Sequence, residues 1–192
     1  MAIVAPRLVL VTGPARSGKS EWAETLAHQA HHQGYQVTYI ATALWDDGDQ
    51  EWCDRLQAHQ RRRPATWHTL EVPHNLTAAI AAATPQDCFL VDSLGTWIAN
   101  SLDLDADQWQ RQQQDLLTQL TTSPGYGIFV AEETGWGVVP PSPAGRLFRD
   151  RLGSCIRHLS TLAHHVYLVT GGHALDLKTL GHPLCAPPPN LA

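Results

Sequence analysis

Residues 8–27 have the sequence LVLVTGPARSGKSEWAETLA, in which three kinds of segment follow one another. Residues 8–12 form a continuous apolar run typical of a buried strand, and the residues from Glu21 onward have the composition and spacing of a helix. Between them stands GPARSGKS, which fits the phosphate-binding pattern G-x-x-x-x-G-K-S in its strand–loop–helix context. We therefore expect the chain to bind a nucleoside triphosphate.

Each part of this loop has a physical role in holding phosphate. The glycines allow a tight turn whose N–H groups point inward at an anion, and the positive end of the following helix adds to that field. Lys19 is expected to reach the β- and γ-phosphates, and the Ser20 hydroxyl to bind Mg²⁺. The residues predicted to bind the nucleotide here are Gly13, Pro14, Ala15, Arg16, Ser17, Gly18, Lys19 and Ser20.

Composition narrows the class of protein. With 192 residues, 43% of them hydrophobic, the chain suits one globular domain, and its net charge of −5 does not favour a nucleic-acid partner. It has no apolar run of about 18 residues, so we expect no membrane span. The four cysteines form no C-x-x-C pair, and the first residues lack the basic region of a signal peptide. These features predict reduced thiols and a cytoplasmic location.

Further apolar runs alternate with helical segments, which predicts an α/β fold with a mainly parallel sheet flanked by helices. We expect a single domain over residues 1–181 and a flexible tail over residues 182–192. Besides residues 8–12, the predicted strands cover residues 36–42, 67–72, 88–92, 127–131 and 165–170, the last of them ending before a Gly-Gly pair.

Asp92 and two glutamates are the acidic candidates for the site. Asp92 ends a buried strand, which is where nucleotide-binding proteins place a carboxylate that holds Mg²⁺ beside the phosphate loop. Glu132 and Glu133 follow another strand, as active-site carboxylates do at the carboxyl edge of a parallel sheet, although loop glutamates there are often only solvated.

The histidines offer two further hypotheses. His28, His31 and His32 have helical spacing and could form a zinc face, but a solvated helix face explains them better because no carboxylate or cysteine completes the set. His59 precedes three arginines that could hold phosphate beside its ring, so it is either a nucleophile for phosphorus or an ordinary exposed helix residue.

Several of these segments together resemble one family, the bifunctional cobinamide kinase/cobinamide-phosphate guanylyltransferases of cobalamin biosynthesis. The similarity runs from about residue 8 to about residue 178. Its most specific parts are the block from His59 through Arg62-Arg63-Pro64 to Trp67, and the block from Glu133 to Asp150. The other matching segments are residues 11–20, Tyr39-Ile40-Ala41-Thr42-Ala43, Thr69 with Glu71, and Val91-Asp92-Ser93-Leu94-Gly95-Thr96-Trp97.

The resemblance implies an activity and a set of roles. Members phosphorylate the hydroxyl of adenosylcobinamide with ATP or GTP and then transfer GMP from GTP to the product, giving adenosylcobinamide-GDP. It implies that His59 carries the GMP, and it adds Arg62, Arg63, Glu71 and Asp92 to the nucleotide-binding set. It also implies a P-loop NTPase (RecA-like) sheet and a trimeric assembly.

The chain departs from the family pattern near the substrate side. Glu132-Glu133 stands where the family usually has Asn-Glu, Gln60 stands in place of Arg, and Ser154-Cys155-Ile156 in place of Arg-Val-Asn. Two other functions therefore stay open at this point: a small-molecule kinase without the guanylyl step, and a regulatory switch that binds nucleoside triphosphate.

Overall fold

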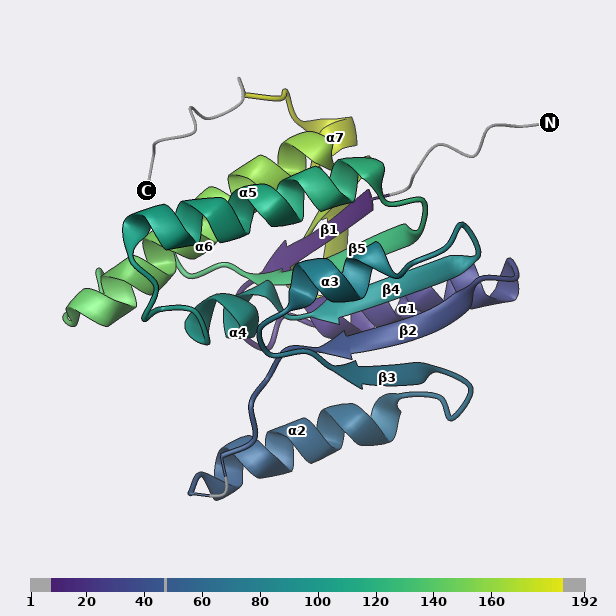
Figure 1. Ribbon diagram of the computed structural model, residues 1–192, viewed down its shortest axis with the longest axis horizontal. Helices are drawn as coiled ribbons and strands as arrows, with labels where there is room; N and C mark the ends of the chain where they lie inside the picture. Colours follow the sequence, from purple (N-terminus) through teal and green to yellow (C-terminus); the bar gives the residue numbers. More distant parts are fainter. Residues whose placement is uncertain (1–7, 47, 185–192) are drawn as a thin grey trace.

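A seven-stranded sheet forms the centre of the molecule (Figure 1). The computed structural model describes residues 8–46 and 48–184. Within them the strand order is β3-β2-β4-β5-β1-β6-β7, and every neighbouring pair is parallel except β6 and β7. The strands are β1 (Leu8–Gly13), β2 (Gln36–Ala41), β3 (His68–Glu71), β4 (Asp87–Asp92), β5 (Tyr126–Glu132), β6 (His165–Thr170) and β7 (His173–Asp176).

The helices differ in how they begin. Four of them start at a side chain that accepts a hydrogen bond from the N–H three residues on: Asp49, Ser93, Asp105 and Ser142. Each such cap contributes about 1 kcal/mol. The first helix instead starts at Gly18 without a side-chain cap, so its first N–H groups are open to an anion. The helices are α1 (Lys19–His32), α2 (Gln50–Arg62), α3 (Leu76–Ala81), α4 (Leu94–Ala99), α5 (Ala106–Thr122), α6 (Pro143–Leu162) and α7 (Leu177–Leu180).

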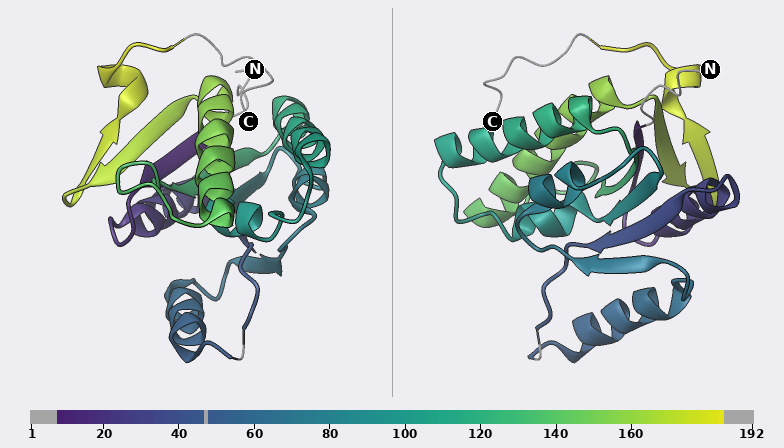
Figure 2. Two further views of the ribbon diagram at one scale, coloured as in Figure 1. Left: turned by 90° about the vertical axis from the view of Figure 1, so that its left-hand side faces the viewer. Right: turned by 45° about the vertical axis from the view of Figure 1, so that its right-hand side comes forward.

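The sheet is buried on both faces because its central strands are apolar on both sides. In β1, Leu8 and Leu10 belong to the apolar cluster that contacts α3, α4, α5 and α6, whereas Val9 and Val11 belong to the cluster that contacts α1. Figures 1 and 2 show the same arrangement, with α1 on one face and the longer pair α5 and α6 on the other. A parallel sheet covered in this way explains the continuous apolar runs of the sequence.

The parallel strands deliver the ends of β1, β4 and β5 to one edge of the sheet. The register pairs Gly13 with Glu132 and Ala41 with Asp92. Because these residues are the last of their strands, the start of the phosphate loop and two carboxylates lie at the same carboxyl edge. This edge is where ligands bind in open α/β sheets.

Helix α2 is the exception to this packing. In both figures it lies below β3, apart from the other helices. Among the described residues, neither apolar cluster contains an α2 side chain. The helix is attached at its ends instead: Cys53 is buried near its start, and the Arg63 guanidinium stacks 3.7 Å from the centroid of the Tyr39 ring just after its end.

The structure contains a strand and a short helix after β6, which was predicted to be the last strand. Gly171 and Gly172 do not end the sheet, because their positive φ angles of 57° and 77° make a tight hairpin that returns β7 antiparallel to β6. Helix α7 follows it. Residues 182–184 have no helix or strand, while residues 1–7 and 185–192 lie outside the described residues, so the domain boundary and the flexible tail stay predictions. No helix over residues 8–46 and 48–184 is both long and apolar enough to cross a membrane.

Candidate active site

The phosphate loop joins β1 to α1 in the predicted conformation. Gly18 has a φ of 91° and Arg16 a φ of 59°, so two residues of the loop lie in the left-handed region. Gly13 has no room for a side chain, since a Cβ there would collide with the Val169 carbonyl and the Ser17 hydroxyl. The loop is therefore a tight turn that leaves its N–H groups for an anion.

Lys19 lies inside this loop. The residue is only 6% exposed, and its Nζ donates to the Pro14 carbonyl at 3.4 Å. Within the described residues no carboxylate lies close enough to form an ion pair with it. A buried ammonium without a carboxylate in contact is unfavourable unless an anion binds to it. This lysine is thus placed for a phosphate group.

Asp92 forms the acidic centre of the site. Tyr39 Oη donates to Asp92 Oδ2 at 2.6 Å, and His59 Nδ1 lies 3.6 Å from the same oxygen. Burial by itself would raise the pKa of Asp92, but hydrogen bonds from His59, Tyr39 and Ser20 outweigh it, and the pKa lies below its ordinary value. Asp92 is therefore ionised at neutral pH.

Ser20 and Asp92 suit a magnesium ion bound to a nucleotide. Mg²⁺ usually takes one or two protein oxygens and fills its remaining positions with phosphate and water. A hydroxyl and an ionised carboxylate that line the same cavity match that donor set. Among the described residues no group of three or more His, Cys, Asp and Glu could hold a metal, so the zinc face is absent there. His28 instead packs against the ring of Trp67.

His59 reaches the site from α2. Its Nδ1 is 3.3 Å from an Arg62 nitrogen as well as 3.6 Å from Asp92, and the histidine side chain is 25% exposed. Arg62 also pairs with Glu24 at 3.2 Å and with Glu21 at 3.5 Å. Both contacts of the histidine involve the same ring nitrogen, so Nε2 is the nitrogen turned away from them.

The two glutamates that follow β5 differ in their surroundings. Glu133 Oε1 accepts a hydrogen bond from Thr12 Oγ1 at 2.7 Å. Glu132 Oε2 is buried and has no hydrogen-bond partner in the described part of the chain. Burial raises the pKa of Glu132, against the lowering effects of Ser93 and Lys19.

Two adjoining cavities collect these side chains. A cavity of about 320 Å³ is lined by Lys19, Ser20, His59, Arg63 and Asp92, together with Ala15, Tyr39, Ala41, Ala43, Trp52, Leu56, Ser93, Gly95, Thr96, Ala99, Glu132 and Phe148. The second, of about 370 Å³, is lined by Arg16, Ser17, Gly18, Lys19, Ser20, Glu21, Glu51, His59 and Arg62. They share Lys19, Ser20 and His59, so the loop and the histidine face one space.

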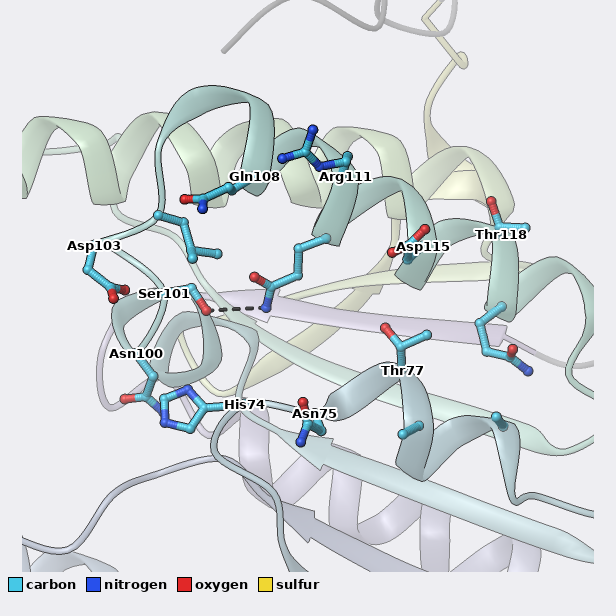
Figure 3. A pocket seen from close by; sticks show the side chains of 15 residues that line it. His74, Asn75, Thr77, Asn100, Ser101, Asp103, Gln108, Arg111, Asp115 and Thr118 are labelled. Atoms are coloured by element: carbon cyan, nitrogen blue, oxygen red, sulfur yellow. Dashed lines mark hydrogen bonds between the residues drawn. The ribbon is translucent and has the colours of Figure 1, made fainter.

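A larger cavity of about 950 Å³ lies elsewhere, between α3 and α5 (Figure 3). Its lining contains amide and hydroxyl side chains such as Gln112, whose Nε2 donates to Ser101 Oγ. No residue predicted for the nucleotide site lines it. The largest of these three cavities is therefore not the candidate active site. The predicted site residues line the two smaller cavities at the carboxyl edge of the sheet.

The structure brings most of the predicted site together and leaves one residue apart. The residues from Ala15 to Ser20, with His59, Arg62, Arg63 and Asp92, line the paired cavities, and Gly13 and Pro14 shape the loop. Glu71 is exposed at the end of β3 and lines neither cavity. The residue patterns did not predict Tyr39, Trp52 and Phe148 as lining residues. The only signal for Tyr39 was its place in a matching family segment.

A comparison with models of protein families identifies the family of this chain. The model of the family described as cobinamide kinase/cobinamide phosphate guanyltransferase matches residues 9–177. The chain belongs to this family. Its phosphate loop, Asp92 and His59 all lie within the region that matches the cobinamide kinase/guanyltransferase family.

Curated relatives agree over nearly the full length. The bifunctional adenosylcobalamin biosynthesis protein CobP of Pseudomonas aeruginosa is 40% identical over 177 residues, covering 91% of this chain and 98% of that protein. The bifunctional adenosylcobalamin biosynthesis protein CobU of Escherichia coli is 34% identical over 187 residues, covering 89% of this chain and 99% of the relative.

Solved structures confirm the predicted P-loop fold at a greater distance. One solved ATPase domain has a TM-score of 0.52 at 13% identity, covering 84% of this chain and 68% of that one. The flagellar accessory protein FlaH of Methanocaldococcus jannaschii has a TM-score of 0.50 at 15% identity, and the match covers 93% of this chain and 82% of the FlaH chain. At this identity the likeness shows the fold alone.

Proposed function

We propose that this chain phosphorylates adenosylcobinamide with ATP or GTP and then transfers GMP from GTP to the product through a guanylyl-histidine at His59. The observation that carries the proposal is the meeting of two separate parts of the chain in one space. Lys19 and Ser20 of the phosphate loop line the same cavity as His59 of α2. A kinase alone needs the loop, whereas a histidine beside it offers a nucleophile for a second reaction.

In the first reaction the phosphate loop holds the triphosphate. N–H groups of the loop and the start of α1 bind the phosphate oxygens, and Lys19 offsets the charge on the transferred phosphoryl group. Ser20 and Asp92 would hold Mg²⁺, which supplies further charge neutralisation when it is bound. The hydroxyl of adenosylcobinamide attacks the γ-phosphorus, and the nucleoside diphosphate leaves.

In the second reaction His59 Nε2 attacks the α-phosphorus of GTP. A bond forms between nitrogen and phosphorus while the bond to pyrophosphate breaks. Asp92 lies beside Nδ1 and stabilises the positive charge that develops on the ring. Arg62 and Arg63 supply cations for the phosphate oxygens. A phosphate oxygen of adenosylcobinamide-phosphate then attacks the same phosphorus, releases the histidine and gives adenosylcobinamide-GDP.

Three further parts of the function stay proposals. The homotrimeric assembly rests on the family resemblance, Mg²⁺ rests on Ser20 of the phosphate loop and on Asp92, and the cytoplasmic location rests on the cysteine pattern and the first residues of the sequence. Light scattering on a sizing column tests the trimer, and a monomer at micromolar concentration would contradict it.

The two rival functions predict different products from GTP and adenosylcobinamide. A kinase alone stops at adenosylcobinamide-phosphate, and a regulatory switch yields only slow hydrolysis.

The guanylyl-histidine is tested by labelling without the corrinoid. With GTP and Mg²⁺, label on the α-phosphate should stay on the protein, and label on the γ-phosphate should leave as pyrophosphate. The adduct should survive alkali and hydrolyse in mild acid, as a phosphoramidate does. His59→Ala should abolish labelling and GMP transfer while adenosylcobinamide is still phosphorylated.

His32→Ala is the matched control, because His32 lies at the exposed end of α1 and lines neither cavity. It should label like the parent protein. Peptide mapping that finds GMP on another residue, or full GMP transfer by His59→Ala, would contradict the assignment of His59 and leave the phosphate loop as the triphosphate site.

A further inference from the structure

The loop between β5 and α6, residues 133–142, carries large apolar side chains that the rest of the described chain leaves uncovered. Val138 is 95% exposed and Trp136 is 62% exposed, and Val139 is exposed as well. Neither apolar cluster of the described residues contains any of the three. Exposed apolar side chains gathered in one short segment mark a surface that binds another molecule. The two proposed reaction steps use none of these residues.

Both ends of this loop are fixed, and one of them is bonded to the phosphate loop. The Glu133 N–H donates to the Gly13 carbonyl at 2.9 Å. At the other end, the Arg146 guanidinium donates to the carbonyls of Pro140 and Pro141 at 3.1 and 2.7 Å. Hydrogen bonds from a charged donor are stronger than neutral ones, so they hold the backbone in place. The exposed residues between these two anchors are thus held close to the start of the phosphate loop.

Helix α6 joins the loop to the wall of the nucleotide cavity. Leu147 is exposed in the second turn of this helix, and its neighbour Phe148 lines the cavity that contains Lys19 and Asp92. In the left view of Figure 2 the green segment between β5 and α6 lies at the carboxyl edge of the sheet. The loop therefore leaves the site beside the phosphate loop and returns to it at Phe148, so its apolar surface is continuous with the nucleotide site.

We propose that Trp136, Val138 and Val139 bind the corrin ring of adenosylcobinamide. The substrate hydroxyl must reach the γ-phosphate, but the two nucleotide cavities, of about 320 and 370 Å³, leave no space for a macrocycle beside a bound nucleotide. The ring must then rest on the surface next to the cavity. A conjugated macrocycle has a broad apolar face on which an indole ring can stack. This inference rests on the proposed function, because it names the residues that recognise its acceptor substrate.

Two other surfaces are less suited to the corrin ring. Leu44 and Trp45 are also exposed at the carboxyl edge, but the Trp52 indole N–H donates to the Leu44 carbonyl and ties this segment to α2, the helix of His59. The cavity between α3 and α5 is lined mainly by amide, hydroxyl and charged side chains, so it lacks a broad apolar face. The loop at residues 133–142 combines an apolar surface with attachment to the phosphate loop.

Binding of adenosylcobinamide without nucleotide tests the loop separately from catalysis. Equilibrium dialysis, read from the visible absorbance of the corrinoid, gives its Kd for the parent protein and for each variant. Trp136→Ala should raise this Kd by about tenfold or more, because it removes the largest apolar contact. In steady-state kinetics the KM for adenosylcobinamide should rise by a similar factor, whereas the KM for GTP should not rise with it. Trp136→Phe keeps an aromatic face and should restore most of the affinity.

Leu180→Ala is the matched control, since Leu180 is an exposed apolar residue of α7 that lines neither nucleotide cavity. It should bind adenosylcobinamide like the parent protein. An unchanged Kd in Trp136→Ala, or an equal rise of both KM values, would overturn the inference.

Light scattering tests whether the loop holds a second copy of the chain instead. A lower molar mass of Trp136→Ala than of the parent protein would overturn the inference, because the exposed side chains would then be a contact between subunits. An unchanged molar mass together with the raised Kd supports it. If the parent protein neither binds nor phosphorylates adenosylcobinamide, the proposed function itself fails, and that result is seen before any variant is compared.

Discussion

Helices α1 and α2 both contribute to the nucleotide pocket, but they are held in place by different forces. Helix α1 buries Ala23, Leu26, Ala27 and Ala30 against one face of the sheet. In the described part of the chain, α2 contributes to neither apolar cluster. Besides the buried Cys53 and the stacking of Arg63 on Tyr39, it is held by polar contacts from Arg62 to Glu21 and Glu24 and from His59 to Asp92.

The two helices therefore support different steps: the loop before α1 binds the triphosphate, and His59 of α2 takes part in guanylyl transfer. The phosphate loop joins a buried strand to a helix with a buried face, so both of its ends are fixed by the core. His59 belongs to α2, whose polar contacts to the rest of the chain include ion pairs that salt weakens. We infer that phosphate binding is the robust property of the site, and that guanylyl transfer is the property more easily lost.

The largest effect is expected from a change at the start of α1, the helix that packs against the sheet. Lys19→Ala removes the buried cation of the loop and should lower the rates of both reactions by about 100-fold or more. Circular dichroism should be unchanged, because Lys19 is not part of the apolar clusters. Product analysis with GTP and adenosylcobinamide measures both rates. Normal rates for both reactions in a folded Lys19→Ala protein would contradict the assignment of the loop.

Hydrogen exchange tests the comparison directly. Amides of α2 should exchange at least about 30-fold faster than those of α1, because opening α2 exposes neither apolar cluster of the described residues. Peptides from residues 50–62 and 19–32 allow the measurement by mass spectrometry. Equal protection of the two helices would show that α2 is held as firmly as the core.

The Mg²⁺ dependence of the kinase rate tests the role of Asp92, which lies beside His59 of α2 and is proposed to hold the metal together with Ser20 of α1. Asp92→Asn keeps the shape of the side chain but removes its charge, so the Mg²⁺ concentration needed for half-maximal kinase rate should rise by about tenfold. Tyr39→Phe provides the comparison, because it removes the hydrogen bond to Asp92 and leaves the carboxylate. A titration of Asp92→Asn that superimposes on that of the parent protein would leave Glu133 as the alternative carboxylate.

The smallest effect is expected from the charges that hold α2. Arg62→Ala removes the contacts to Glu21, Glu24 and His59 and should lower the rate of guanylylation by about fivefold, with a smaller effect on phosphorylation. Arg61→Ala is the matched control, since Arg61 bonds to Gln57 on its own helix and lines neither cavity. Equal effects of the two substitutions would mean that general charge matters and not the contact.

The residue patterns predicted the packed half of the molecule well. Apolar runs located β1, β2, β4, β5 and β6 because strands buried on both faces have no alternation to obscure them. The four-residue strand β7 was missed, because it is too short for a periodic signal and the preceding Gly171-Gly172 was read as an end. Glu71 was expected at the nucleotide but lies on the exposed edge strand β3, away from both cavities, so its role stays a prediction.

The phosphate loop could be read directly from the residues, since the spacing of Gly13, Gly18, Lys19 and Ser20 is a local property of eight consecutive positions. The family could be read in the same way, through segments that match in order along the chain. The folded chain was needed to show that His59 and Glu132 line the same cavity as Lys19 and Ser20 of the loop. Those relations depend on the register of parallel strands and on the path of α2, because they join residues that are far apart in the chain.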